Sequence, residues 1–263
     1  MNLRGAWALV RGLWLSWLQY ASFFFVLAFG WMVPPLIYLF VWSTAAGETT
    51  IGGLSRGAFV AYYLVLILVN QLTYAQTNWT VGDLIRSGGM NRILLRPMPA
   101  IFDAIASEMA GKVVYLIFDL PVVVALALWL NPELTWRVDT VLAFIPAVIG
   151  AWALRFLWGY ALAVLAFWAS RADALLALQD SLIFLLAGQV APIALLPEPL
   201  ATLAAVLPFR YMVAFPVEIL TGQLDGGAIA NGFVMQGVWL LGAAIVARVL
   251  WVRGIGRYAA IGG

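Results

Sequence analysis

Four ionisable residues lie within or near the ends of long apolar stretches of this chain, where a charge is most informative: Asp119, Arg155, Asp180 and Glu218. A charged side chain inside a bilayer is costly, so it usually pairs with another group or serves an ion or substrate pathway. We expect Asp119 and Arg155 to form an intramembrane ion pair in the inner half of the membrane. A structural role is favoured over a proton or substrate role for this pair.

Cysteine and histidine are absent from the chain. Their absence excludes disulfides, thiolate or imidazole metal sites, and catalytic pairs of Ser or Cys with His. A P-loop is missing too, because Gly111-Lys112 is followed by Val113 and lacks the upstream glycine. We therefore expect no catalytic residue, metal ion or bound cofactor on this chain. Active transport would take its energy from a separate ATPase or from an ion gradient.

Residues 80–99 form a polar stretch between two apolar ones. The stretch combines charged residues with a glycine break and a proline stop: Asp83, Arg86, Gly88, Gly89, Arg92, Arg96 and Pro97. Apolar residues interleave with the charged ones, which is typical of an amphipathic helix held at a membrane surface. Such a helix suits docking to a cytoplasmic partner. The alternative, a helix that only lines the lipid headgroups, fits the periodicity equally well.

The elements that must position these residues are long enough to cross a bilayer. Hydrophobic residues make up 65% of the chain and charged residues 10%, whereas soluble domains have about 45–50% and about 25%. A bilayer core of roughly 30 Å needs about 20 apolar residues in a helix. Six stretches meet or approach that length: 21–42, 58–76, 112–130, 139–168, 174–195 and 230–252. The sequence predicts an all-α membrane protein with six transmembrane helices in a single domain, residues 1–263.

Lysine and arginine are distributed unevenly around the six stretches. One side of the six-helix arrangement holds Arg4, Arg11, Arg86, Arg92, Arg96, Lys112, Arg171, Arg248, Arg253 and Arg257. Cytoplasmic loops carry the excess of basic residues, so both termini should be cytoplasmic. The formal net charge of +2 is too small to indicate nucleic acid, and membrane lipid is the expected surrounding.

Residues 1–20 place apolar and aromatic side chains at helical spacing, with Arg4 and Arg11 near another face. This pattern is typical of a helix lying in the membrane interface. The alternative is a continuous N-terminal extension of the first transmembrane helix.

A re-entrant element is expected at residues 197–216, where four prolines interrupt an apolar run: Pro197, Pro199, Pro208 and Pro216. Each interior proline removes a helical hydrogen bond and clashes with the preceding turn. We expect two short helices that dip into the outer leaflet and pack on the bundle, because irregular backbone at that depth needs shelter. The alternative is a plain extracellular loop.

This order of elements resembles the ABC-2 type permeases. Five segments carry the resemblance: IRSGGMNRILLRPMP (85–99), FWASRADAL (167–175), GQVAPIALLPEPL (188–200), LPFRYMVAFPVEILTG (207–222) and GIGRYAAIGG (254–263). The last segment is similar to the ending of one subgroup of exporter permeases. The resemblance covers nearly the whole chain, but Asp119 and Arg155 match none of its functional motifs.

The resemblance implies a permease subunit of an ATP-driven exporter in a bacterial plasma (inner) membrane. Its partners would be a second permease, identical or related, and two cytoplasmic ATPase subunits that bind ATP and Mg. The segment at residues 83–97 would be a coupling helix seated on the ATPase through Asp83, Arg86, Asn91, Arg92, Leu95, Arg96 and Pro97. The re-entrant element would form an outer gate with Pro197, Pro199, Pro208, Phe209 and Pro216. ATP binding would drive alternating access between discrete packings.

Aromatic residues in the first two apolar stretches suggest a substrate class: Phe23, Phe24, Phe25, Phe40, Trp42, Tyr62 and Tyr63. As walls of a translocation path, they suit an amphiphilic, lipid-like, drug-like or glycan substrate better than a hydrated ion. An ion-coupled secondary transporter with six spans remains an alternative and would need no ATPase. A membrane-embedded enzyme or scaffold is a third reading, and the lack of His and Cys argues against the enzyme.

Overall fold

The structure, a computed structural model, describes residues 11–12, 21–134, 137–169 and 171–258, with side chains described from residue 29 onward in the first helix. Within these residues the regular structure is helical and contains no β-strand. The expected all-α fold is confirmed. The interfacial helix expected over residues 1–20 lies outside the described residues, apart from residues 11–12.

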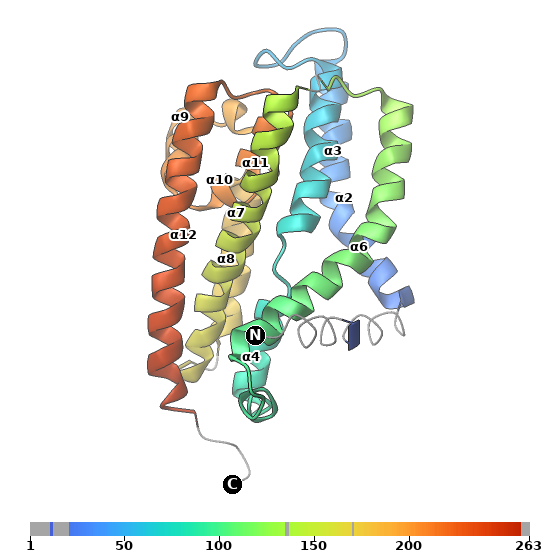
Figure 1. The fold of residues 1–263 in the computed structure, drawn as a ribbon. Coiled ribbons are helices and arrows are strands. Elements are labelled where there is room, and N and C mark those ends of the chain that lie inside the picture. The colour runs from blue at the N-terminus through green and yellow to red at the C-terminus, as the bar shows by residue number, and fades with distance from the viewer. Residues whose placement is uncertain (1–10, 13–20, 135–136, 170, 259–263) are drawn as a thin grey trace.

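Five helical stretches of the described chain are long and apolar enough to cross a membrane: Phe29–Ala46, Arg56–Arg86, Ala100–Leu130, Val138–Phe167 and Gly226–Ile255. The long helices in them are α2 (Ala21–Ala46), α3 (Arg56–Thr73), α6 (Ala100–Leu130), α7 (Val138–Val164) and α12 (Gly226–Ile255). Helices α2, α3, α6 and α7 alternate in direction along the bundle, whereas α12 runs in the same direction as α7 (Figure 1). The first part of α6 is inclined away from the bundle axis (Figure 1). The helix contains Pro121, and an interior proline is a common cause of a bend.

The fifth predicted span, residues 174–195, is shorter than the sequence predicts. Its helix α8 (Ala172–Leu186) has 15 residues, which at ~1.5 Å per residue is about 22 Å and less than the roughly 30 Å of a bilayer core. The helix ends before Gly188, which has a φ of +76°, a left-handed conformation that favours glycine. Because residues 174–195 are almost continuously apolar, hydropathy alone does not indicate this break.

Three short helices follow α8: α9 (Glu198–Val206), α10 (Phe209–Met212) and α11 (Ala214–Leu220). The sequence predicts two. Pro197 and Pro208 directly precede α9 and α10, and Pro216 lies in the first turn of α11, where a proline removes no helical hydrogen bond. Since α7 ends where α8 begins and α12 starts at the opposite end (Figure 1), residues 172–225 together cross the bundle.

Helix α3 lies at the centre of the bundle and contacts α2, α6, α7 and α11. Its residues Phe59, Tyr62, Tyr63 and Leu66 are fully buried in the main hydrophobic core, and Trp42 of α2 stacks on Phe59. Tyr62 and Tyr63, which the sequence analysis expects in the wall of a translocation path, are packed inside this chain and face none of its surfaces.

The polar segment at residues 80–99 lies at one end of the bundle (Figure 1). After α3 ends, the chain forms α4 (Thr77–Arg86), turns, and forms the single turn α5 (Asn91–Leu94). Gly88, with a φ of +77°, makes the turn. The amphipathic helix, its glycine break and its stop before α6 are all present.

Candidate functional site

Arg86, in the last turn of α4, joins this helix to α8. Its guanidinium contacts Asp83 one turn earlier in α4. It also donates a hydrogen bond of 2.9 Å to the carboxylate of Asp173, which lies in the first turn of α8. The ion pairs fix α4 to the start of α8, so the two helices should move together.

Tyr258 holds the turn between α4 and α5 from the C-terminal side. Its hydroxyl donates to the carbonyl oxygen of Gly88 at 2.7 Å and accepts from the backbone N–H of Asn91 at 3.2 Å. The ring also packs edge-on against Phe167, in the short 3-10 helix Leu165–Phe167 that follows α7. The segment after α12 therefore shapes the turn that precedes α5.

The tip of the segment presents an apolar side chain between polar ones. Leu95 is 86% exposed, more than any other large hydrophobic residue of the described chain. Asn91, Arg92 and Pro97 around it are exposed as well. Arg96 differs, because it pairs with Asp103 in the first turn of α6. The tip is thus an exposed surface on an anchored base.

The break between α3 and α4 is held by a buried ionic group on α6. The Glu108 carboxylate accepts hydrogen bonds from the backbone N–H and the hydroxyl of Thr77. Lys112 lies 3.5 Å from the same carboxylate and donates to the Tyr74 carbonyl oxygen at 2.7 Å. These contacts satisfy backbone groups that the break leaves unpaired. No group of three acidic side chains in the described residues is arranged to hold a metal ion.

Arg155 of α7 is the centre of a polar cluster inside the bundle. Its guanidinium donates to Asn70 at 2.9 Å and to Thr73 at 3.3 Å. It also lies 5.0 Å from the ring centroid of Tyr74. Asp180 of α8 is 3.8 Å away, which is an ion-pair distance but too long for a hydrogen bond.

The expected ion pair between Asp119 and Arg155, both described residues, is not formed. The buried Asp119 carboxylate accepts a hydrogen bond from Gln71, whereas Arg155 turns to Asn70 and Asp180. Neighbouring residues of a helix point about 100° apart. Asn70 and Gln71 therefore face two different helices, α7 and α6, which separates the two charges.

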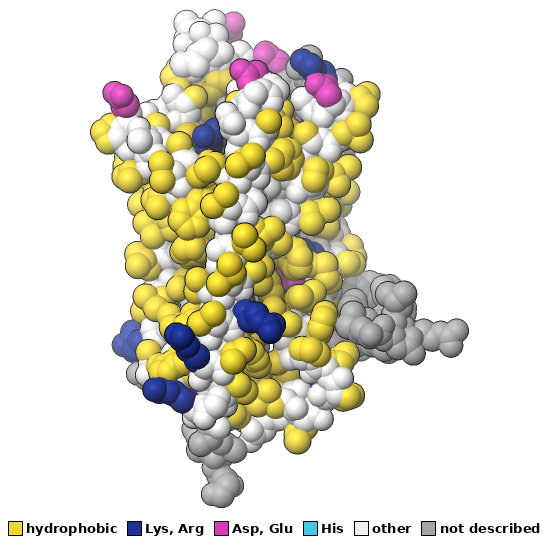
Figure 2. All heavy atoms as spheres, turned by 60° about the vertical axis from the view of Figure 1, so that its left-hand side comes forward, with side chains coloured by type: hydrophobic (Ala, Val, Ile, Leu, Met, Phe, Trp, Pro, Cys, Tyr) yellow, Lys and Arg dark blue, Asp and Glu magenta, His cyan; other side chains and the backbone are white. Residues whose placement is uncertain are grey.

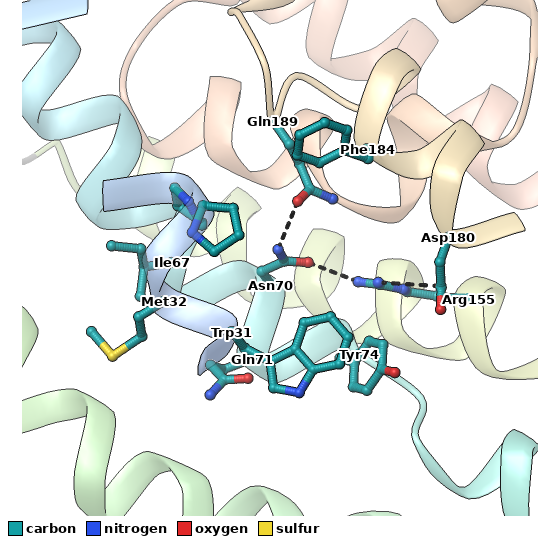
Figure 3. Close-up of a pocket in the computed structure, with 12 residues that line it drawn as sticks. Trp31, Met32, Ile67, Asn70, Gln71, Tyr74, Arg155, Asp180, Phe184 and Gln189 are labelled. Atoms are coloured by element: carbon teal, nitrogen blue, oxygen red, sulfur yellow. Dashed lines mark hydrogen bonds and ion pairs between the residues drawn. The ribbon is translucent and has the colours of Figure 1, made fainter. Parts of the chain in front are cut away.

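A cavity of about 130 Å³ lies beside Arg155, between α2, α3, α7 and α8. Figure 3 shows the guanidinium between Asn70 and Asp180, with Gln189 and Phe184 on one side and the rings of Trp31 and Tyr74 on the other. The Asn70 amide donates to the Gln189 side chain at 3.0 Å, so the segment after α8 forms part of the wall.

The short helices after α8 contain a second buried ion pair. Arg210 donates to the Glu218 carboxylate at 2.8 Å, joining α10 to α11. Of the residues expected at an outer gate, Pro208, Phe209 and Pro216 are buried, whereas Pro197 and Pro199 are exposed. The structure thus divides this predicted set into core residues and surface residues.

A family model described as ABC-2 family transporter protein matches residues 29–262. The chain belongs to this family. No curated protein and no solved structure matches it significantly. The family match spans α4–α5, the cavity and the short helices. As an ABC-2 family member, the chain is a multi-pass membrane permease of an ABC transporter, a class of membrane component that works with ATPase subunits.

Sequence reasoning missed the residues that anchor the polar segment of this ABC-2 permease. Asp103, Asp173 and Tyr258 hold its base, and Glu108 holds the break before α4. Asp173 and Tyr258 lie within motifs that carry the resemblance, which was a usable signal. Neither Asp103 nor Glu108 stands out from the sequence, because each is defined only by its neighbours in space.

Proposed function

We propose that this ABC-2 permease forms half of the translocation pathway of an ATP-driven exporter for amphiphilic molecules, and that α4–α5 docks on a cytoplasmic ATPase subunit. The complete transporter contains two ATPase subunits, which bind ATP and Mg, and a second permease, identical or related. It lies in a bacterial plasma membrane, with both termini in the cytoplasm.

The observation that carries this proposal is the exposed Leu95 on an anchored base. An apolar side chain that is 86% exposed at a polar end of the bundle is a suitable anchor for a pocket on a partner. Arg92 beside it would add charge contacts at the rim. Because Arg86 and Arg96 tie the segment to α8 and α6, force applied at the tip reaches the bundle.

The distribution of charge supports the orientation. On the face shown in Figure 2, lysine and arginine side chains gather toward one end, and acidic side chains toward the other. Arg248, Arg253 and Arg257 of α12 and its following turn lie at the end that carries α4–α5. Basic residues near transmembrane helices favour the cytoplasmic side, which is where an ATPase meets the permease.

Movement of the tip has a direct route to the interior through α8. Asp173 and Asp180 are seven residues apart on this helix, so they lie on similar faces about two turns, or ~10 Å, apart. Asp173 holds Arg86, and Asp180 lies beside Arg155 at the cavity. A tilt of α4 would therefore displace α8 at the cavity wall, as a rocking mechanism requires.

Charge reversal at the tip tests the docking role. Arg92→Glu should abolish co-purification of the ATPase and leave membrane insertion unchanged. Arg56→Glu is the matched control, because Arg56 is exposed at the opposite end of the bundle. Leu95→Asp should act like Arg92→Glu, and Leu95→Met should retain the ATPase. Undiminished ATPase binding by both tip variants would refute the docking role, and transport without any ATPase would indicate a secondary carrier.

A further inference from the structure

We propose that the cavity beside Arg155 binds the zwitterionic headgroup of an amphiphile, with the anionic group toward Arg155 and the amine toward Asp180. This inference rests on the proposed export function and narrows its substrate class to amphiphiles with a phosphoethanolamine-like headgroup. The cavity is formed within this single chain, so its binding properties can be measured apart from ATPase docking.

The cavity contains a buried cation with unused binding capacity. The Arg155 side chain is 4% exposed, and its Nε atom has no hydrogen-bond partner among the described residues. A buried donor without a partner is costly, and an anionic oxygen would satisfy it. Gln189, whose side-chain oxygen accepts from Asn70, has its amide nitrogen on the same cavity wall (Figure 3).

Asp180 makes a simple anion an unsuitable ligand. Its side chain is 25% exposed, whereas that of Arg155 is 4% exposed, so the carboxylate is the more accessible of the two charged groups. The two charges are 3.8 Å apart and share no hydrogen bond. A lone anion would meet repulsion from Asp180, and a lone cation would meet repulsion from Arg155. A headgroup that carries both charges matches both groups.

The size and surroundings of the cavity indicate that only the headgroup enters. Its volume of about 130 Å³ is well below the ~300–1,000 Å³ typical of sites that enclose a drug-sized molecule. Trp31 and Phe184 form part of its wall. The flanking helices α2 and α8 expose apolar side chains, including Ile37 and Leu185. An acyl chain can lie along these surfaces while the headgroup occupies the cavity.

Native mass spectrometry of the purified full chain tests the assignment. The probes are phosphatidylethanolamine, phosphatidylglycerol and a cationic dialkyl ammonium lipid with identical short chains. The wild type should bind phosphatidylethanolamine about tenfold more tightly than phosphatidylglycerol, since one charge-assisted hydrogen bond contributes about that factor. Equal affinity for the two phospholipids would overturn the proposal. Binding of free phosphoethanolamine as tight as that of the lipid would refute the amphiphile assignment.

Charge variants should change which headgroup is preferred. Asp180→Asn should remove the preference for phosphatidylethanolamine over phosphatidylglycerol. The repulsion between the Asp180 carboxylate and an anionic headgroup is then lost, while Arg155 still attracts the phosphate. Asp139→Asn, an exposed aspartate at the start of α7, is the matched control and should keep the wild-type preference. Arg155→Gln should shift binding toward the cationic lipid. An unchanged preference in Asp180→Asn would refute the role of the carboxylate even if Arg155→Gln fails to fold.

The lipid-binding measurement and the ATPase co-purification test the two proposals independently. Loss of headgroup selectivity with normal ATPase co-purification would refute the cavity assignment alone. Retained selectivity in a chain that binds no ATPase would refute the docking role alone.

Discussion

The Tyr62 hydroxyl donates a 2.9 Å hydrogen bond to the carbonyl oxygen of Gly188 and joins the centre of α3 to the backbone just after α8. Tyr63 and Trp42 both donate to the carbonyl oxygen of Val190, two residues further along this irregular segment, at 3.0 and 2.8 Å. Non-helical backbone deep in a membrane protein must find partners inside the protein. Three aromatic side chains thus stabilise the break at the end of α8.

Removing the Tyr62 hydroxyl should destabilise the bundle. In Tyr62→Phe, the Gly188 carbonyl oxygen would remain buried without this donor, at a cost of about 1–3 kcal/mol. The decrease should be measurable as a lower unfolding midpoint of the purified protein in detergent. Tyr38→Phe is the control, because Tyr38 is half-buried and its hydroxyl makes no described hydrogen bond. Equal midpoints for the two variants would show that the Tyr62 bond contributes nothing.

Gly188→Ala should be more damaging than glycine replacement at a comparable turn. A Cβ at this position would collide with the Tyr62 hydroxyl, in addition to the strain of a φ of +76°. Gly222→Ala is the control, since its φ is +70° and nothing lies within 4 Å of the added Cβ. The difference between their unfolding midpoints isolates the collision. Adding Tyr62→Phe should relieve part of the Gly188→Ala defect, and strict additivity would contradict this explanation.

The Arg210–Glu218 pair should stabilise the short helices. The Glu218 side chain is 4% exposed and that of Arg210 is 21% exposed. Glu218→Ala would leave a mostly buried cation unpaired and should cost about 3 kcal/mol in unfolding free energy. Asp139→Ala breaks the exposed pair with Arg137 and should cause no measurable change. A similar midpoint for both variants would mean that the 210–218 pair is not a significant stabilising contact.

The long helices could be predicted because the apolar stretch of a transmembrane helix must be long enough to cross the bilayer core. The end of α8 could not, since the residues around Gly188 are nearly as apolar as a transmembrane helix. Its carbonyl groups are satisfied by Tyr62, Tyr63 and Trp42, which are more than a hundred residues away in the chain. Hydrophobic periodicity depends only on residues that are close in sequence. A prediction based on it therefore extends the helix through such a break.

The charged residues illustrate the same limit. Sequence reasoning identified Asp119 and Arg155 as costly in lipid and paired them with each other, because both were expected at the same depth. Depth alone does not determine a pair. The rotation of α3 directs Gln71 to Asp119 and Asn70 to Arg155, so amide side chains, which no charge count reveals, provide the contacts.

Orientation in the membrane can be tested directly because the chain contains no cysteine. Single cysteines at Asn91 in α5 and Glu48 in the loop after α2 would be exposed at opposite ends of the bundle. A membrane-impermeant maleimide should label the cysteine at position 91 only in inside-out vesicles and the one at position 48 only in intact cells. The cysteine-free parent provides the background. The reverse pattern would place the basic end and α4–α5 outside, where no cytoplasmic ATPase could reach Leu95.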